Sequence, residues 1–247
     1  MKASTTRFSD RVEDYIRYRP SYPAKVINVL QETIGFTSQN IVADIGAGTG
    51  ISAQLFLNNG NKVFAVEPNK EMRDASVTLL SKYEHFASIN GTAENTALQN
   101  DYVDLVFVAQ AFHWFNRQLT KIEFERIMKP LGHIALVWNV RKEEDAFQKG
   151  YERMLQSVDD YNYVNHKNVS DEEIETFFAP RSFKKIVLEN SQVFNVEGFK
   201  GRLMSSSYFP KEGAEHERLI KEAGELFREH EKNGVIHFLY DTTMYIC

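Results

Sequence analysis

Three glycines, Gly46, Gly48 and Gly50, follow a short apolar segment and precede a stretch with the composition of a helix. Glycine allows positive φ angles and lets a ligand approach the backbone closely. The first turn of a helix also offers unpaired N–H groups to a ligand. A strand at 41–45, this glycine turn and a helix at 51–57 therefore predict a nucleotide-binding turn. A purely structural tight turn is the alternative.

The spacing of the glycines differs from that of two common nucleotide-binding motifs. The dinucleotide pattern needs a third glycine where Ile51 stands, and no Gly-Lys-Ser/Thr of a P-loop follows. Asp44 stands at the predicted strand end, where a carboxylate would repel a pyrophosphate and attract a cationic ligand. The segment resembles motif I of the class I S-adenosylmethionine-dependent methyltransferases, whose cofactor carries an ammonium, a sulfonium and no phosphate. The cofactor-binding residues that this resemblance implies are Asp44, Gly46, Ala47, Gly48 and Gly50.

A second predicted strand, residues 62–66, ends directly before Glu67. In Rossmann-like folds an acid about 20 residues beyond the glycine turn accepts hydrogen bonds from ribose hydroxyls. A surface acid at the start of the next helix is the alternative. Glu67 and Pro68, with Met72 soon after, resemble the second motif of the same class, which implies that these three residues bind the cofactor.

Later segments resemble further motifs of the class. In the segment 91–95, Ala93 and Glu94 are implied to lie beside the adenine ring, where a backbone N–H or a carboxylate can bind the exocyclic amine. A predicted strand at 103–109 leads into Gln110 and an aromatic stretch similar to motif IV, which lies next to the methyl donor. A helix, a turn and a strand are expected over 126–138. This order of motifs implies S-adenosylmethionine as the cofactor.

Composition limits the partners of the chain. It has 247 residues, 43% of them hydrophobic, and a net charge of −5. This length is enough for one sizeable domain. The absence of a basic run argues against a nucleic-acid substrate, and no apolar run approaches the about 18 residues of a membrane span. The N-terminus is too polar for a secretory signal, and the single cysteine allows no internal disulfide. We expect a cytoplasmic protein with a small-molecule substrate and no nucleic-acid or membrane partner. The oligomeric state is left open.

Strands and helices alternate over residues 39–140, which predicts an α/β fold with a Rossmann-like, doubly wound, mostly parallel sheet. Further on we expect helices at 143–158, from Ser170 with a Ser170–Glu173 capping box, and at 214–230, and strands at 183–196 and 235–246. The resemblance implies that the two late strands form an antiparallel hairpin at the sheet edge. We predict a single domain with an N-terminal lid (1–38), a cofactor-binding core (39–140) and a helical insertion with edge strands (141–247).

The segment 15–23 combines tyrosines, arginines and prolines, which is typical of a stiff segment and not of a regular helix. It resembles the lead-in of a methyltransferase branch that includes trans-aconitate methyltransferases. The resemblance implies a lid in which Arg19 binds a carboxylate of the cofactor or of an acidic substrate. Tyrosines packed on the sheet, with arginines facing solvent, are the alternative. The candidate substrate residues here are Tyr15, Tyr18, Arg19 and Tyr22.

Other substrate candidates lie at predicted strand ends, where open α/β sheets bind ligands, and in the late helical region. They are Trp114, Trp138, Asn139, Arg141 and Tyr208, the last in a segment similar to a serine–tyrosine segment of the same branch. His113 is a candidate for proton transfer, because histidine titrates near neutral pH. Core packing is the alternative for His113 and for both tryptophans. The remaining histidines lack partners at metal-ligand spacing, so we expect no metal.

Methyl transfer from a sulfonium is an in-line displacement, which depends mainly on alignment and on exclusion of water. A carboxylate acceptor needs no base. Three hypotheses remain open. The first is an O-methyltransferase of a small molecule, with carboxylic acids favoured. The second is a C- or N-methyltransferase of a lipid-like or aromatic metabolite, and the third is a non-catalytic S-adenosylmethionine-binding protein.

Overall fold

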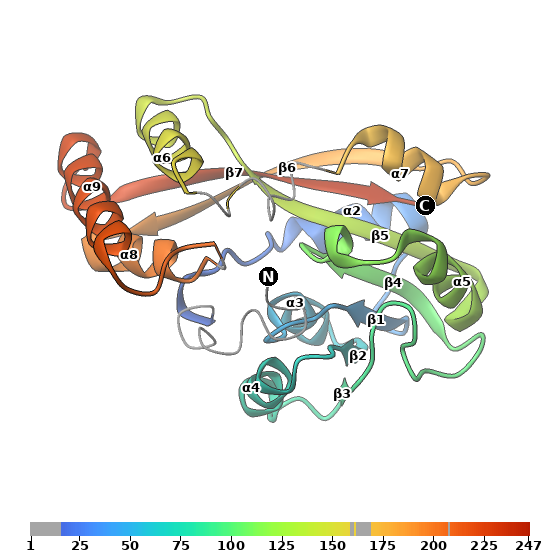
Figure 1. Cartoon of the computed structure of the whole chain (residues 1–247). Coiled ribbons are helices and arrows are strands. Elements are labelled where there is room, and N and C mark those ends of the chain that lie inside the picture. Colours follow the sequence, from blue (N-terminus) through green and yellow to red (C-terminus); the bar gives the residue numbers. More distant parts are fainter. Residues whose placement is uncertain (1–15, 159–160, 162–168, 207) are drawn as a thin grey trace.

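One seven-stranded sheet with the order β3-β2-β1-β4-β5-β7-β6 organises the chain in the computed structural model (Figure 1). The structure describes residues 16–158, 161, 169–206 and 208–247. Strands β1 to β5 pair in parallel, and β7 runs antiparallel to both β5 and β6. The predicted Rossmann-like sheet with an antiparallel edge is therefore confirmed.

The parallel part of the sheet follows the predicted alternation. Its elements are α2 (Lys25–Ile34), β1 (Ile41–Ile45), α3 (Ile51–Asn58), β2 (Lys62–Val66), α4 (Lys70–Leu80), β3 (Phe86–Ile89), β4 (Val103–Ala109), η3 (Phe112–Trp114), α5 (Arg117–Ile127) and β5 (Met128–Arg141). The turn expected between the helix and the strand within 126–138 is wrong, because α5 passes directly into β5. Strand β3 went unplaced in the sequence, since its residues are all half-buried and show no alternation.

The helix α2 belongs to the core of the molecule. Its buried residues Val26, Ile27 and Leu30 join Val42 and Phe107 of the sheet in one hydrophobic cluster. The predicted N-terminal lid (1–38) therefore includes a helix that packs in the core, and only the residues before 25 remain available for a lid.

A second correction concerns residues 16–18, which are helical, although we expected no regular helix there. Proline restricts the backbone dihedral angles mainly at its own position and at the residue before it. A helical turn can therefore end at Tyr18, ahead of Pro20 and Pro23.

The C-terminal part places a helical layer at one end of two long strands. Its elements are α6 (Ala146–Gln156), α7 (Asp171–Phe178), β6 (Lys184–Phe194), α8 (Val196–Met204), α9 (Ala214–His230) and β7 (Ile236–Ile246). In Figure 1, α6, α8 and α9 gather at one end of β6 and β7, while α7 lies at the other end, near α5. Aromatic side chains of Phe147, Tyr151, Phe199 and Phe238 form the core of this helical layer. The predicted Ser170–Glu173 capping box is present.

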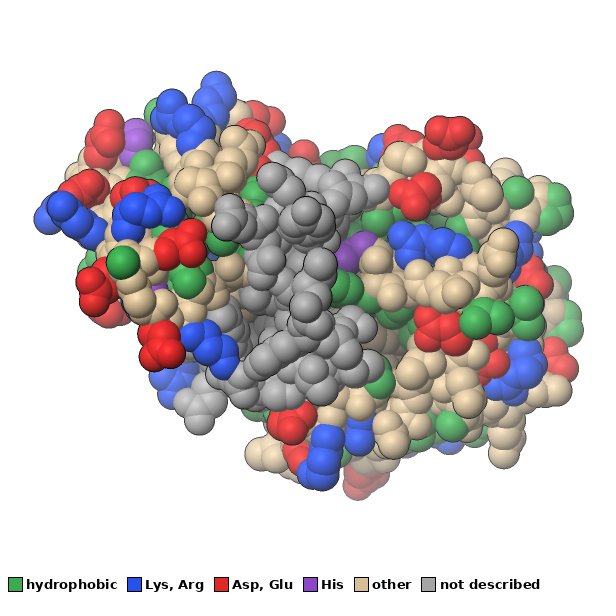
Figure 2. All heavy atoms as spheres, viewed as in Figure 1, with side chains coloured by type: hydrophobic (Ala, Val, Ile, Leu, Met, Phe, Trp, Pro, Cys, Tyr) green, Lys and Arg blue, Asp and Glu red, His purple; other side chains and the backbone are tan. Residues whose placement is uncertain are grey.

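The surface carries charges of both signs. On the face shown in Figure 2, Lys and Arg side chains are interspersed with Asp and Glu side chains, and the described residues form no continuous basic area there. None of the helices that the structure describes combines the length and the apolar character needed to cross a membrane.

Candidate active site

The glycine turn after β1 has a conformation that requires glycine. Gly46, Gly48 and Gly50 all have positive φ angles, of 70°, 57° and 87°. A Cβ atom at Gly46 would lie 2.6 Å from Cβ of Ala111, and one at Gly50 would lie 2.6 Å from Cδ1 of Leu80. The turn thus packs between α4 and the segment after β4, and it places the start of α3 at the carboxyl end of β1.

A cavity of about 230 Å³ opens at the carboxyl ends of β1, β2 and β4. Predicted cofactor residues that line it are Gly46, Gly48, Glu67, Pro68, Met72, Ala93, Glu94 and Gln110. The lining also includes Trp114, which we predicted on the substrate side, and Asn69, Thr92, Ala109, Ala111 and Phe115, which the sequence analysis missed. Each missed residue is a chain neighbour of a residue already singled out, so the motifs located the cavity but not its full wall. The remaining cofactor candidates, Asp44, Ala47 and Gly50, do not line this cavity.

The Glu67 carboxylate lies in the cavity wall and is held by two backbone groups. It accepts hydrogen bonds from the N–H of Gly48 and from the N–H of Asn69, each at 2.9 Å. Burial raises the pKa of Glu67, while these two hydrogen bonds and the positive Arg73 oppose the increase. A carboxylate has about four lone-pair positions, so the fixed group can accept further hydrogen bonds from hydroxyls of a ligand.

Asp44 is fully buried behind the glycine turn. Ser52 Oγ donates a hydrogen bond to its Oδ2 at 2.7 Å, whereas Oδ1 has no hydrogen-bond partner among the described residues. Burial raises the pKa of Asp44 to about 7, although the Ser52 hydrogen bond opposes this. A buried acceptor without a partner is rare in proteins, and it fits a cofactor that carries an ammonium group.

His113 lies on η3, beside the cavity wall but not in it. Burial and the positive charge of Arg117 lower its pKa to about 4. Our argument that His113 titrates near neutral pH is therefore wrong. Its Nδ1 atom is buried without a hydrogen-bond partner among the described residues. General bases work best with a pKa near the working pH. With a pKa of about 4, the His113 imidazole is a weak base at neutral pH.

The N-terminal candidates lie against the helical layer and the sheet. The Tyr18 ring occupies the space next to Gly201 of α8, where no Cβ atom would fit. Nη2 of Arg19 donates a hydrogen bond to the carbonyl oxygen of Ser205 at 3.0 Å. Tyr22 packs edge-on against Phe107, with 6.4 Å between ring centroids. The segment therefore joins α8 to the sheet. Tyr15 lies outside the described residues.

Asn139 of β5 takes part in four hydrogen bonds that involve side chains. Its Oδ1 accepts from Thr242 Oγ1 at 2.6 Å and from Asn190 Nδ2 at 3.1 Å, and its Nδ2 donates to the carbonyl oxygen of Ser21 at 3.3 Å. Its own carbonyl oxygen accepts from Nε2 of Gln110, a cavity residue, at 3.0 Å. The side chain therefore connects the N-terminal segment to three strands.

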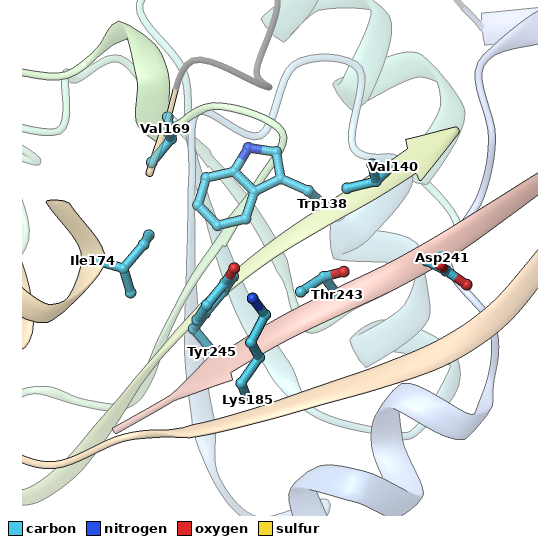
Figure 3. A pocket seen from close by; sticks show the side chains of 8 residues that line it. All are labelled: Trp138, Val140, Val169, Ile174, Lys185, Asp241, Thr243 and Tyr245. Atoms are coloured by element: carbon cyan, nitrogen blue, oxygen red, sulfur yellow. The ribbon is translucent and has the colours of Figure 1, made fainter. Parts of the chain in front are cut away.

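Trp138 lines a second cavity, of about 260 Å³, on the face of the sheet next to α7. Figure 3 shows its indole and the Tyr245 ring facing this cavity, with Val169 and Ile174 on the α7 side. The indole Nε1 is buried without a hydrogen-bond partner among the described residues. Trp114 and Trp138, both predicted on the substrate side, thus line different cavities.

Arg141 and Tyr208 meet in the helical layer. Arg141 is buried, and its Nη2 donates to Glu152 Oε2 at 2.7 Å and to Tyr161 Oη at 2.6 Å. Tyr208 packs edge-on against Tyr161, with 4.9 Å between ring centroids. Burial opposes ionisation of Tyr208, yet the nearby Arg141 and Arg202 hold its pKa below the ordinary value. The structure thereby adds Arg202, which the sequence analysis missed, to this cluster.

Comparisons with known proteins agree with this geometry. Residues 43–136 match the family model described as a methyltransferase domain. An uncharacterized methyltransferase of Mycobacterium tuberculosis is 38% identical over 136 residues, covering 55% of this chain and 53% of that protein. An uncharacterized methyltransferase-like protein of Schizosaccharomyces pombe is 32% identical over 137 residues, covering 55% of this chain and 52% of the relative. The chain matches about half the length of these curated relatives.

A solved structure extends the likeness along the chain. A proposed type II methyltransferase from Anaeromyxobacter dehalogenans superimposes with a TM-score of 0.66 at 19% identity, covering 93% of this chain and 96% of that one. At this identity the likeness concerns the fold. Residues 43–136 thus match a methyltransferase domain, and the sheet and the glycine turn agree with the Rossmann-like fold of the S-adenosylmethionine-dependent class. The cofactor of this class is S-adenosylmethionine.

Proposed function

We propose that this protein transfers a methyl group from S-adenosylmethionine to an oxygen of a small carboxylic acid. The observation that carries the transfer is the cavity at the strand ends, where the Glu67 carboxylate is fixed by two backbone N–H groups inside a methyltransferase domain. The buried arginines of the helical layer, together with Arg19, support a carboxylate acceptor. They also agree with the resemblance of the N-terminal segment to the trans-aconitate branch.

In this proposal, the chain binds and aligns the reactants. Glu67 accepts hydrogen bonds from ribose hydroxyls, and the walls at Ala93 and Glu94 hold the adenine ring. The Asp44 carboxyl group, which has an unpartnered oxygen, lies buried behind the glycine turn and adds negative charge near the ammonium end. Gln110 and Trp114 close the cavity next to the transferred group and exclude water.

When bound, S-adenosylmethionine would supply an electrophilic methyl group to the acceptor oxygen. A carboxylate is ionised at neutral pH and is already nucleophilic, so this reaction needs no base. The pKa of His113, about 4, agrees with such a mechanism. We therefore assign His113 no proton transfer.

One observation favours a second candidate function. Apolar and aromatic side chains, among them Val140, Ile174 and Tyr245, form much of the wall of the cavity beside Trp138, which Thr243 and the charged Lys185 and Asp241 complete. Such a wall suits a lipid-like or aromatic acceptor, which would be methylated on carbon or nitrogen. Binding of the cofactor without turnover is the third possibility, which the test below separates from the other two.

The test combines binding with transfer of label. Calorimetric titration with S-adenosylhomocysteine should give binding to the wild type and weaker binding to Glu67→Gln. Incubation with methyl-labelled S-adenosylmethionine and a panel of carboxylic acids should yield a labelled methyl ester, which mild alkali hydrolyses. Alkali-stable label on carbon or nitrogen would favour the second candidate. Binding without any labelled product would favour the third, and an absence of binding would refute all three.

A further inference from the structure

Arg202, in the last turn of α8, is a buried cation for which the described residues supply no counter-charge. Its side chain is 4% exposed. Its Nη1 donates a hydrogen bond to Ser206 Oγ at 3.1 Å, while its Nε has no hydrogen-bond partner among the described residues. No carboxylate in the described part of the chain forms an ion pair with Arg202.

The carboxylate of Glu152 forms an ion pair with another arginine, Arg141. Glu152 Oε2 pairs with Arg141 Nη2 at 2.7 Å, and both oxygens of Glu152 accept from Tyr161 Oη, at 2.9 and 2.7 Å. The groups that act electrostatically on Arg202 are the hydroxyls of Tyr151, Tyr208 and Tyr240 and the positive Arg141. The described surroundings of Arg202 are therefore neutral or positive.

A buried charge without a partner is costly for a folded protein. A lysine could avoid the cost by losing its proton, but arginine remains protonated in proteins. Groups that lower stability in this way are characteristic of functional sites, where the missing partner arrives with the ligand. The planar guanidinium offers paired N–H groups that match the two oxygens of a carboxylate.

The surroundings of Arg202 also contain a link to the N-terminal segment. The turn that follows α8 carries Ser205, whose carbonyl oxygen accepts the hydrogen bond from Arg19, and Ser206, which accepts from Arg202. Three arginines from distant parts of the sequence thus converge on one small region, where Glu152 forms an ion pair with Arg141.

We propose that Arg202, with Ser206 and Tyr208, binds a carboxylate of the methyl acceptor, and that Arg141 and Arg19 add positive charge around it. This inference rests on the proposed function and names the residues that select an acidic acceptor. The carboxylate of the methionine end of the cofactor is the competing ligand of the same chemistry. The two sources are separated by measuring acceptor and cofactor binding independently.

The experiment measures thermal unfolding of the wild type, Arg202→Met and Arg202→Lys, with Lys200→Met as the control. Lys200 lies on the same helix and pairs with Glu197 at 3.5 Å, so its removal tests a general loss of positive charge. The probes are succinate and trans-aconitate, each compared with sodium chloride at equal ionic strength. Stabilisation by a ligand follows its affinity for the folded state.

We expect at least one probe to raise the melting temperature of the wild type and of Lys200→Met. The probe concentration needed for a given rise in melting temperature should be about 10- to 100-fold higher in Arg202→Met, as for loss of a hydrogen bond to a charged group. Arg202→Lys keeps the charge without the planar fork and should give an intermediate response. Without ligand, Arg202→Met should melt at the wild-type temperature or above it, because an unpaired buried charge is gone.

Four outcomes would overturn the inference. They are an equal carboxylate response in the wild type and Arg202→Met, no response of the wild type to either probe, a lower melting temperature of ligand-free Arg202→Met, or weakened S-adenosylhomocysteine binding in that variant. The last outcome would assign Arg202 to the cofactor. Failure of the wild type to bind S-adenosylhomocysteine would instead refute the proposed function, so the two failures are distinguishable.

Discussion

Replacement of the buried Asp44 by asparagine should change how stability depends on pH. The ordinary pKa of this carboxyl group is 3.8, and burial raises it to about 7 in the folded protein. Between these pH values the folded state keeps a proton that the unfolded chain has lost, so the free energy of unfolding falls as pH rises. At about 1.36 kcal/mol per pKa unit, the loss reaches about 4 kcal/mol above pH 7.

The assay is urea unfolding of the wild type and Asp44→Asn at pH 5, 6, 7 and 8. The free energy of unfolding of the variant minus that of the wild type should increase by about 3 kcal/mol across this range and level off above about pH 7. A constant contribution from the amide cancels in this comparison. Asp74→Asn, at an exposed acid on α4, serves as the control. A difference that does not vary with pH would refute our account of the buried carboxyl group.

Four further predictions concern the cavity and the N-terminal segment. Glu67→Ala should weaken S-adenosylhomocysteine binding by about 1.5–3 kcal/mol in calorimetry, the range for a hydrogen bond to a charged group; an unchanged affinity would contradict the role of Glu67. Gly48→Val should abolish this binding, with a native circular dichroism spectrum, because Gly48 lines the cavity at a positive φ angle. Arg19→Lys should lower turnover, since it loses the guanidinium that bonds Ser205. Trypsin cleavage after Arg17 should slow when S-adenosylhomocysteine is added, and equal rates would argue against a lid.

The cavity at the strand ends was largely predictable because its signals are local in the sequence. Three glycines follow β1 directly, and Glu67 follows β2 directly, so parallel pairing of the two strands brings them to one edge. The sequence cannot show that the Glu67 carboxylate is already held by the N–H groups of Gly48 and Asn69. That contact depends on the exact position of β2 beside β1.

The proposed acceptor side was less predictable because its environment comes from distant segments. Arg202 lies on α8 in a sequence that reads as a partly polar surface helix, and it becomes buried only when the aromatic layer of α6, α9 and β7 packs against α8. His113 likewise seemed suited to proton transfer until its burial next to Arg117 was visible. Residue type indicates chemical capacity, whereas the local dielectric and neighbouring charges determine whether the capacity is used.

The place of β7 between β5 and β6 affects how the chain is completed during synthesis. Strand β6 leaves the ribosome before β7, yet its partner in the sheet is β7. Until β7 emerges, β6 and the outer edge of β5 both present unpaired backbone groups that other chains could join. Nascent chains fold in order from the N-terminus, so the parallel strands can assemble before β6 and β7 join the sheet. The period of greatest risk of aggregation therefore lasts from the emergence of residue 184 until residue 246 has emerged.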